Sequence, residues 1–255
     1  MPPVTYVLAA LFGLLIGSFL NVCIHRLPKD ESIVWPASHC TSCSRALAWY
    51  ENIPVFSYLA LRGRCRTCRA RISLQYPIVE LATAGIVVGA LGWYGLTPLF
   101  AVRAAFACAM LVLFAIDLQH QILPNEITVP GIVLGLAAST FLEPGWRSAL
   151  VGAVAGGGVL WLVGWVYERV RRQEGLGFGD VKMLAMIGAF LGWPLMLLTL
   201  VLASFAGSAV GLGLIAARRG GMGSKLPFGS FLAVGAIVAA LAGPDLVAWY
   251  AGFYR

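Results

Sequence analysis

Charged residues are scarce in this sequence of 255 residues. Only 11% of the residues are charged, whereas 60% are hydrophobic and the mean hydropathy is +0.85. Soluble globular domains carry about 25% charged residues, so this composition lies far outside their range. The scarcity of charge therefore excludes an ordinary soluble enzyme and indicates that a lipid bilayer surrounds most of the chain.

The apolar residues gather in eight segments, and we predict that each is a helix of an all-α integral membrane protein. The segments cover residues 6–23, 78–94, 99–116, 127–142, 149–167, 181–192, 195–217 and 228–242. Most of them approach the roughly 17–25 residues that a spanning helix needs. The sixth has only 12 residues. At about 1.5 Å per residue it reaches roughly 18 Å of a hydrocarbon core about 30 Å thick. The sequence thus predicts about eight transmembrane helices, one of them short.

Basic residues are absent before the first apolar segment, whereas Arg26 and Lys29 follow it. This order argues against a cleaved secretory signal and predicts a retained first helix with its N-terminus outside. The cytoplasmic loops are then 24–77, 117–126, 168–182 and 217–227, and they contain 15 of the 18 Lys and Arg residues. The bias follows the positive-inside rule. The net charge of +7 is accordingly a signal of topology and of attraction to anionic lipid, and no nucleic-acid partner is predicted.

One stretch, residues 24–77, is long and polar enough to form an extramembrane domain. It separates the first helix, 1–23, from a helical bundle, 78–255, and it holds four of the six cysteines and a cluster of arginines. Small residues within the bundle, such as the run 156–158, allow close helix contact in lipid. An internal repeat of the kind common in transporters is lacking. We predict one small cytoplasmic domain between the first and second helices.

Four cysteines of this domain form two C-x2-C pairs. Cys40 and Cys43 make the first pair, Cys65 and Cys68 make the second, and 21 residues separate the pairs. Each pair can donate two thiolates to a tetrahedral ion, and the cytosolic side keeps thiols reduced. Because four ligands leave no open position, a zinc ion here would fold the small domain and would not act as a catalyst. Redox-active dithiols are the alternative, since nearby arginines can lower thiol pKa values.

Two of the eleven acidic residues occupy unusual places. Asp117 ends the third apolar segment, and Asp180 opens the short sixth one. The third segment is predicted to run inward and the sixth outward, so we expect both carboxylates at the same depth on the cytoplasmic side. Two carboxylates within hydrogen-bonding reach cannot both ionise cheaply, and they therefore share a proton. One can act as a base on a water molecule while the other acts as an acid on a scissile carbonyl, which is aspartic-protease chemistry.

Features beside Asp180 suit the entry of a peptide. Gly177 and Gly179 allow a substrate backbone to approach, and a truncated helix leaves room for water. Lys182 is either a contact for a substrate carboxylate or a side chain that reaches the lipid headgroups. The alternative for both aspartates is that they cap or anchor helix ends. A phosphate-binding loop is excluded, because the glycine run lacks the Lys-Ser/Thr ending.

A series of motifs resembles, in order, those of the type IV prepilin leader peptidase family, whose members carry a GxGD motif. The series comprises Gly17-Ser-Phe-Leu-Asn21, Arg26-Leu-Pro28, the two cysteine pairs, Trp49-Tyr-Glu-Asn-Ile-Pro54, Leu61-Arg-Gly63, Tyr76-Pro77, Asp117, Gly177-Phe-Gly179-Asp180 and Leu226-Pro-Phe-Gly229. The resemblance extends over essentially the whole chain. Two departures are small: Gln75 stands where a basic or aromatic residue is expected, and Ser230 stands where a proline is common.

The resemblance implies a bifunctional enzyme of the bacterial inner membrane whose active site faces the cytoplasm. Such an enzyme cleaves the leaders of type IV prepilins and type II secretion pseudopilins and then methylates the new N-terminus with S-adenosylmethionine. It implies Asp117 and Asp180 as the catalytic pair and the four cysteines as a zinc site. A glycine-rich cofactor fingerprint is lacking. Weak candidates for contacts with the cofactor or the substrate amine are Glu51, Asn52, Glu80, Ser18 and Asn21, for which a packing role is equally expected.

Two other classes of function stay open at this point, as does the formation of a homodimer. A membrane zinc or thiol redox protein without peptidase activity would use the cysteines and keep the aspartates as helix anchors. A transporter would use the aspartates to carry protons. Their predicted place at one membrane face, away from the midplane, argues against a transporter.

Overall fold

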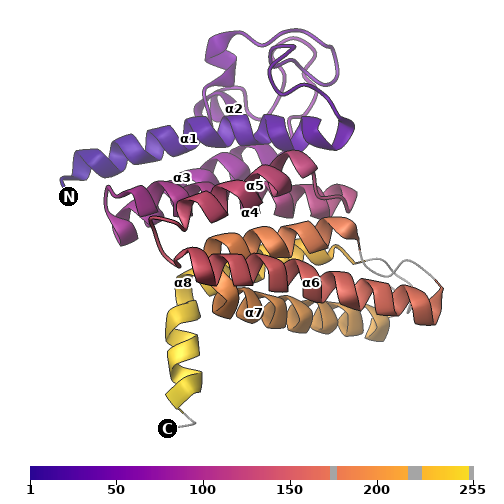
Figure 1. Ribbon diagram of the computed structural model, residues 1–255. Helices are drawn as coiled ribbons and strands as arrows, with labels where there is room; N and C mark the ends of the chain where they lie inside the picture. The colour runs from indigo at the N-terminus through magenta and orange to yellow at the C-terminus, as the bar shows by residue number, and fades with distance from the viewer. Residues whose placement is uncertain (173–176, 218–225, 253–255) are drawn as a thin grey trace. The chain divides into compact units, whose positions relative to one another are not determined.

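The computed structural model describes residues 1–172, 177–217 and 226–252, and within these ranges the chain is helical (Figure 1). The α-helices are α1 (Pro3–Arg26), α2 (Phe56–Ala60), α3 (Gln75–Tyr94), α4 (Pro98–His120), α5 (Asn125–Ala138), α6 (Trp146–Arg171), α7 (Phe178–Ala216) and α8 (Phe228–Gly252); the 3-10 helices are η1 (Leu27–Lys29) and η2 (Trp49–Asn52). In these ranges, β-structure is limited to two isolated bridges. The all-α prediction is confirmed. Three basic residues of the predicted loop 217–227, namely Arg218, Arg219 and Lys225, lie outside the described residues.

Six described helices are long and apolar enough to cross a membrane: α1, α3, α4, α6, α7 and α8. Each predicted apolar segment falls on a helical stretch. The sixth and seventh segments are the two halves of α7, which are separate helical stretches joined at Gly192, where the backbone is not helical (φ 78°, ψ 171°). The fourth segment falls mainly on α5, whose 14 residues extend about 21 Å. The structure supports a multi-pass membrane protein, and the number of eight crossings stays a prediction.

The chain divides into two compact units, Met1–Val112 and Leu113–Arg255, and the boundary falls inside α4. The predicted division into 1–23, 24–77 and 78–255 separates polar from apolar sequence, whereas these units reflect packing. That division stays a prediction.

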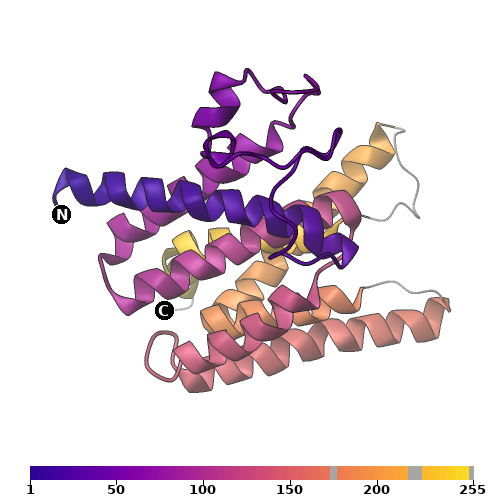
Figure 2. The ribbon, with the colours of Figure 1, turned by 90° about the horizontal axis from the view of Figure 1, so that it is seen from above.

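In the first unit, α1 packs along α3 (Figures 1 and 2). Three contacts spaced by four residues set an antiparallel register: Gly13 with Ala84, Gly17 with Glu80, and Asn21 with Tyr76. A Cβ atom on Gly13 or on Gly17 would come within 2.6 Å of a Cα atom of α3. Glycines spaced by four residues lie on one face of a helix and let two backbones approach closely in lipid. The glycines therefore fix how closely α1 and α3 approach.

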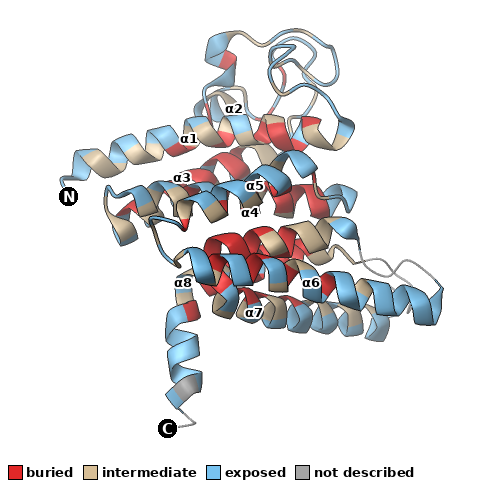
Figure 3. Ribbon diagram, in the orientation of Figure 1, coloured by how far each residue is buried: buried red, intermediate tan, exposed pale blue. Residues whose placement is uncertain are grey.

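In the second unit, α7 contacts α5, α6 and α8. Its first half is the most buried part of the described chain, and Figure 3 shows this concentration in red. Gly188 of α7 crosses Gly152 of α6 so closely that a Cβ atom on Gly188 would come within 2.2 Å of the Gly152 carbonyl oxygen. This crossing holds the helix that begins near Asp180 against its neighbour.

Candidate functional site

Asp117 lies in the last turn of α4 and is buried, with 4% of its surface exposed. Its Oδ2 atom accepts two hydrogen bonds from Ser230, one from the backbone N–H at 2.6 Å and one from the hydroxyl at 3.0 Å. Ser230 lies in the first turn of α8, where backbone N–H groups have no partner one turn earlier in the helix. The same N–H also lies 3.2 Å from the carbonyl oxygen of Pro227. The start of α8 is thus the donor that holds Asp117.

The absence of a side chain at Gly229 allows this contact. A Cβ atom there would lie 3.1 Å from both Cγ and Oδ2 of Asp117 and 2.9 Å from Cδ1 of Leu123. Any larger residue would push the start of α8 away from the carboxyl group. The Pro-Phe-Gly sequence before Ser230 therefore has a physical role: it ends a loop and lets α8 begin directly against Asp117.

Asp180 lies in the first turn of α7 and is half-buried, and its N–H donates to the carbonyl oxygen of Gly177 at 3.1 Å. Its carboxyl group is close enough to that of Asp117 for the two to interact electrostatically. Leu123 packs against residues next to both aspartates. A Cβ atom on Gly179, beside Asp180, would lie 2.9 Å from the Cβ atom of Leu123, and Gly229, beside Asp117, packs against the Cδ1 atom of Leu123. The two aspartates therefore belong to one site, and their catalytic role stays a prediction.

Lys182 connects α7 to α5 in the same region. Its ammonium group donates a hydrogen bond to the side-chain oxygen of Asn125, the first residue of α5, and lies 4.9 Å from the centre of the Phe178 ring. Contact with the ring face of an aromatic residue is favourable for a cation. This side chain already has partners within the chain. The end of α4 and the starts of α5, α7 and α8 consequently meet at one end of the second unit.

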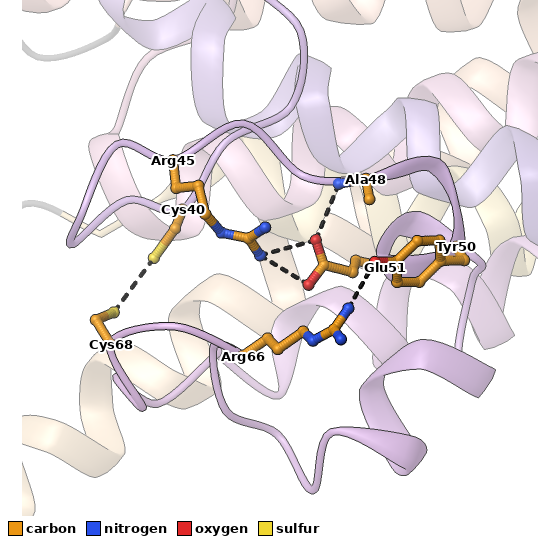
Figure 4. Close-up of polar contacts among 7 residues, drawn as sticks. All are labelled: Cys40, Arg45, Ala48, Tyr50, Glu51, Arg66 and Cys68. Atoms are coloured by element: carbon orange, nitrogen blue, oxygen red, sulfur yellow. Dashed lines mark hydrogen bonds and ion pairs between the residues drawn. The ribbon is translucent and has the colours of Figure 1, made fainter.

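The four predicted zinc ligands form a second site, in the first unit. The Sγ atoms of Cys40, Cys43, Cys65 and Cys68 all lie within 4.8 Å of one another. Those of Cys40 and Cys68 are 3.8 Å apart (Figure 4). A tetrahedral ion with metal–sulfur bonds of about 2.3 Å requires sulfur atoms about 3.8 Å apart, whereas a disulfide requires about 2.05 Å. All four cysteines are free thiols, and their arrangement fits zinc.

The two C-x2-C pairs fold as equivalent turns. The N–H of Cys40 donates to the carbonyl oxygen of Arg45, and the N–H of Cys65 donates to that of Ala70, both at 2.9 Å. The residue after the second cysteine has a positive φ in both turns, 56° at Ser44 and 60° at Arg69. Each turn therefore presents its two thiols in the same way. The two C-x2-C pairs thus share the same turn conformation as well as the same spacing.

Backbone amides prepare this cluster for a cation. The amides of Cys68 and Thr67 donate to the sulfur of Cys65 and lower the pKa of its thiol to about 6. The amides of Ser42 and Cys43 likewise lower the pKa of Cys40. At Cys68 the amide of Ala70 favours the thiolate, but burial and the neighbouring thiols outweigh it and raise the pKa to about 11. A divalent ion would displace the proton that the cluster retains.

The carboxylate of Glu51 accepts hydrogen bonds from groups within the chain. One guanidinium nitrogen of Arg45 donates to both of its carboxylate oxygens, at 2.7 and 2.8 Å, and the N–H of Ala48 donates at 2.9 Å (Figure 4). The Arg45 hydrogen bond and the Ala48 amide lower the pKa of Glu51. Arg66 donates to the Tyr50 hydroxyl at 2.5 Å. One arginine from each cysteine turn thus holds η2.

The other candidates for cofactor contacts give no better assignment. Glu80 is buried in α3, and its Oε2 accepts the N–H of Val55 at 2.7 Å. Asn21 donates to the carbonyl oxygen of Tyr76 at 3.0 Å, within the contact of α1 with α3. Asn52 is exposed. Both carboxylates therefore have structural partners, and a cofactor contact at these residues stays a prediction.

Sequence reasoning missed two functional features of these sites. Ser230 was noted only as a departure from a resemblance, although a Pro-Phe-Gly sequence before an apolar segment signals a helix start with spare N–H donors. The four-residue spacing of Gly13 and Gly17 is a signal for close helix packing and could also have been used.

Comparison with known proteins identifies the family of the chain. The model of the bacterial peptidase A24 N-terminal domain matches residues 11–94, and that of the type IV leader peptidase family matches residues 104–212, which include both aspartates. A prepilin leader peptidase/N-methyltransferase of Pseudomonas putida is 39% identical, with 97% of this chain and 94% of the relative covered. One from Stutzerimonas stutzeri is 38% identical (99% and 96%), and one from Burkholderia pseudomallei strain 1026b is 41% identical (89% and 82%).

No solved structure matches the chain significantly. The two family models together match about three quarters of the chain, and the curated relatives align over nearly its full length. On this agreement, the chain belongs to the type IV leader peptidase family.

Proposed function

We propose that this chain is a prepilin leader peptidase of the bacterial inner membrane that also methylates the N-terminus it creates. Its substrates are type IV prepilins and type II secretion pseudopilins, and its active site faces the cytoplasm. The observation that supports the peptidase most directly is the pair of Asp117 and Asp180 at the meeting point of four helix ends. The names of the curated relatives support both activities.

The proposed hydrolysis uses the two carboxyl groups and one water molecule. One carboxylate takes a proton from the water as its oxygen attacks the scissile carbonyl carbon, while the other carboxyl group gives its proton to the carbonyl oxygen. The C–N bond then breaks as the carboxyl group that took the water proton passes it to the departing amine, and a hydroxyl proton of the tetrahedral intermediate returns to the other carboxylate. Ser230 binds Asp117 only at Oδ2, so we assign Oδ2 to holding the carboxyl group and Oδ1 to the water.

The depth of the site suits a prepilin. Such a substrate has a basic leader in the cytoplasm and an apolar helix in the membrane, so its cleavage point lies near the inner interface. Gly177 is exposed and can lie against an extended substrate backbone. The space beside Gly179 is taken by Leu123, so we assign Gly179 to packing rather than to substrate approach.

The four cysteines would hold a structural zinc ion, which would supply a crosslink between the two turns. An ion with four thiolate ligands has no open coordination position, so it takes no part in hydrolysis. The arginines beside the turns bind Glu51 and Tyr50, and this pairing favours a structural over a redox role.

Methyl transfer with S-adenosylmethionine is proposed from the names of the relatives alone. Because Glu51 and Glu80 are both bound within the chain, we assign no residue to the cofactor and derive no step through it.

The test is to incubate the purified protein in lipid with a prepilin and labelled S-adenosylmethionine and to follow leader loss and label transfer. We expect both in the wild type, and leader loss to stop in Asp117→Asn and in Asp180→Asn. A precleaved pilin separates the reactions, because both variants should still label it. Full cleavage by either variant would contradict the catalytic pair. Less than one zinc ion per chain together with intact disulfides would favour the redox alternative.

A further inference from the structure

A strained turn follows η2 in the first unit. Val55 has φ 60° and ψ −50°, and the N–H of Phe56 donates to the carbonyl oxygen of Pro54 at 2.6 Å. These values describe a γ-turn of the rare form with positive φ, which a β-branched residue adopts only at a cost. The turn is held by the buried carboxylate of Glu80, which accepts the N–H of Val55. Strain that the surroundings maintain in this way points to a function for the segment.

The position of Glu80 tells how deep the turn lies. Glu80 is five residues past Gln75, the first residue of α3, which places it roughly 8 Å along the helix. The same residue packs against Gly17 in the middle of the contact between α1 and α3. Both helices are candidate membrane spans. The turn therefore lies beside a membrane-crossing helix, about one and a half helical turns inside its end.

The backbone of this turn can enter an apolar medium. Pro54 has no N–H group, and the N–H of Val55 is bound by Glu80. The N–H groups of Phe56, Ser57 and Leu59 donate to carbonyl oxygens of the same segment. Non-helical backbone is tolerated at membrane depth only where its polar groups are paired in this manner.

The side chains around the turn are apolar and exposed. Trp49 is 81% exposed, Phe56 61% and Leu59 66%. Phe56 and Leu59 are three residues apart on α2 and so lie on one face. Ile78 and Leu81 on the neighbouring part of α3, a candidate membrane span, are exposed to a similar degree. The apolar surface of the turn thus continues a surface that faces lipid.

A basic stretch follows α2 directly. Between Glu51 and Glu80 the sequence has no acidic residue, and it has five arginines, all of them exposed: Arg62, Arg64, Arg66, Arg69 and Arg71. Basic residues near an anionic leaflet are attracted to its surface. Aromatic residues followed by exposed arginines are the composition of a segment that lies in a membrane interface.

We propose that residues 49–61 form an interfacial anchor, which inserts Trp49, Phe56 and Leu59 into the boundary between headgroups and acyl chains beside α3. Arg62, Arg64, Arg69 and Arg71 lie in the headgroup layer and bind anionic phospholipid, whereas Arg66 holds Tyr50. Glu80 sets the depth of the anchor by holding Val55. This proposal depends on α3 crossing the membrane and not on the peptidase or methyltransferase activity.

Photocrosslinking of the full-length protein in lipid nanodiscs tests the anchor. A benzoylphenylalanine probe replaces Phe56 in one protein and Leu59 in a second, in discs of phosphatidylethanolamine and phosphatidylglycerol. A probe at Leu8, exposed on α1, gives the yield for a lipid-facing position, and a probe at Thr41, exposed in the first cysteine turn, gives that for a polar surface. Zinc content and retained helicity show that each protein is folded.

We expect lipid adducts at Phe56 and Leu59 with yields close to that at Leu8 and at least several-fold above that at Thr41. Adducts to a peptide of this chain or of a second copy would overturn the proposal, because protein would then cover the segment. Yields as low as that at Thr41 would overturn it as well. Replacing phosphatidylglycerol by phosphatidylcholine should lower the yield at Phe56 and leave that at Leu8 unchanged, and an unchanged yield at Phe56 would contradict the role of the arginines.

Discussion

The cysteine turns of the first unit and the helix crossing of the second unit are stabilised by different kinds of contact. The cysteine turns lie between α1 and α3 in the sequence. There, four thiols and the ion pair of Arg45 with Glu51 connect short irregular segments. In the second unit, glycines and apolar residues bring α6 and α7 into backbone contact. Among the described residues of that unit, Asp117 alone has a buried carboxyl group, and it accepts hydrogen bonds from Ser230.

This difference follows from the surroundings of each region. A segment of some fifty residues outside the bilayer cannot bury enough apolar surface and needs a crosslink. Within lipid the hydrophobic effect does not drive helices together, so close packing of small residues takes its place. A carboxylate there needs donors, and the free N–H groups at helix starts are the nearest source. We therefore expect substitutions in the cysteine turns to impair zinc binding and local folding, and substitutions in the second unit to impair catalysis or helix packing.

The largest expected effect on a reaction rate is the loss of leader hydrolysis. Asp117→Asn and Asp180→Asn each remove a group that transfers a proton, and such groups contribute about 10²–10⁴-fold to a rate. We expect the initial rate of leader cleavage to fall by that factor in each variant. The zinc content should be unchanged, because the cysteines belong to the other unit. Cleavage near the wild-type rate in either variant would show that the carboxyl groups only anchor helix ends.

The largest expected effect on stability is at the cysteine turns. Structural zinc contributes on the order of 10–16 kcal/mol in zinc-finger peptides. We expect Cys43→Ser combined with Cys68→Ser to abolish zinc binding and to open residues 30–74 to limited proteolysis, while the helices resist. The matched control is Cys108→Ala, since Cys108 is buried in α4 and is not part of the cluster. Zinc at one ion per chain after the double substitution would contradict the assignment.

Local features of the sequence predicted much of this organisation. The C-x2-C spacing determines each cysteine turn within five residues, so the cluster was expected and its sulfur atoms do lie together. Asp117 and Asp180 stood out because a carboxylate beside an apolar segment is rare, and the structure brings them to one site. The apolar segments predicted helices because a helix pairs all the backbone polar groups of a segment within the segment itself, as lipid requires.

Contacts between distant residues could not be predicted in this way. Ser230 and Asp117 are 113 residues apart, and their hydrogen bonds depend on where α8 begins relative to the end of α4. The bond from Val55 to Glu80 likewise depends on the register of α3 against α1. Such features arise from packing, which a pattern along one chain does not contain.

A smaller effect is expected from crowding the helix crossing. In Gly188→Ala the new Cβ atom would lie 2.2 Å from the Gly152 carbonyl oxygen, so α6 and α7 must separate. Overpacking of this kind costs about 1–3 kcal/mol. Gly158→Ala is the control, because a Cβ atom at this position of α6 meets open space. Denaturation in mild detergent should rank Gly188→Ala below the wild type and Gly158→Ala at or above it, and the reverse order would contradict the close crossing.

A comparable effect on rate is expected at Ser230. Ser230→Ala removes the hydroxyl donor to Asp117, and Ser230→Pro removes the N–H donor as well. A hydrogen bond to a charged group contributes about 1.5–3 kcal/mol, so we expect kcat to fall roughly 10- to 100-fold with alanine and further with proline, at an unchanged KM. Proline is tolerated in the first turn of a helix, so the loss would not reflect unfolding. Recovery by Ser230→Thr would support positioning, whereas a proline variant as active as the wild type would remove Ser230 from the site.

The smallest expected effect concerns Glu51 and appears only as a dependence on pH. Arg45 lowers the pKa of Glu51 in the folded chain, so the pair stabilises the fold above the ordinary pKa of a glutamate, about 4.3, and this contribution is lost as pH falls through the lower, folded pKa. Acid also protonates the thiols and releases zinc, which would mask the effect in one protein. The stability difference between the wild type and Glu51→Gln removes the thiol contribution, because both proteins carry the same four cysteines. We expect that difference to be constant from pH 7 to about pH 5 and to shrink below it. A difference that stays constant at lower pH would mean that Arg45 holds glutamine as well as glutamate and that charge plays no part in binding η2.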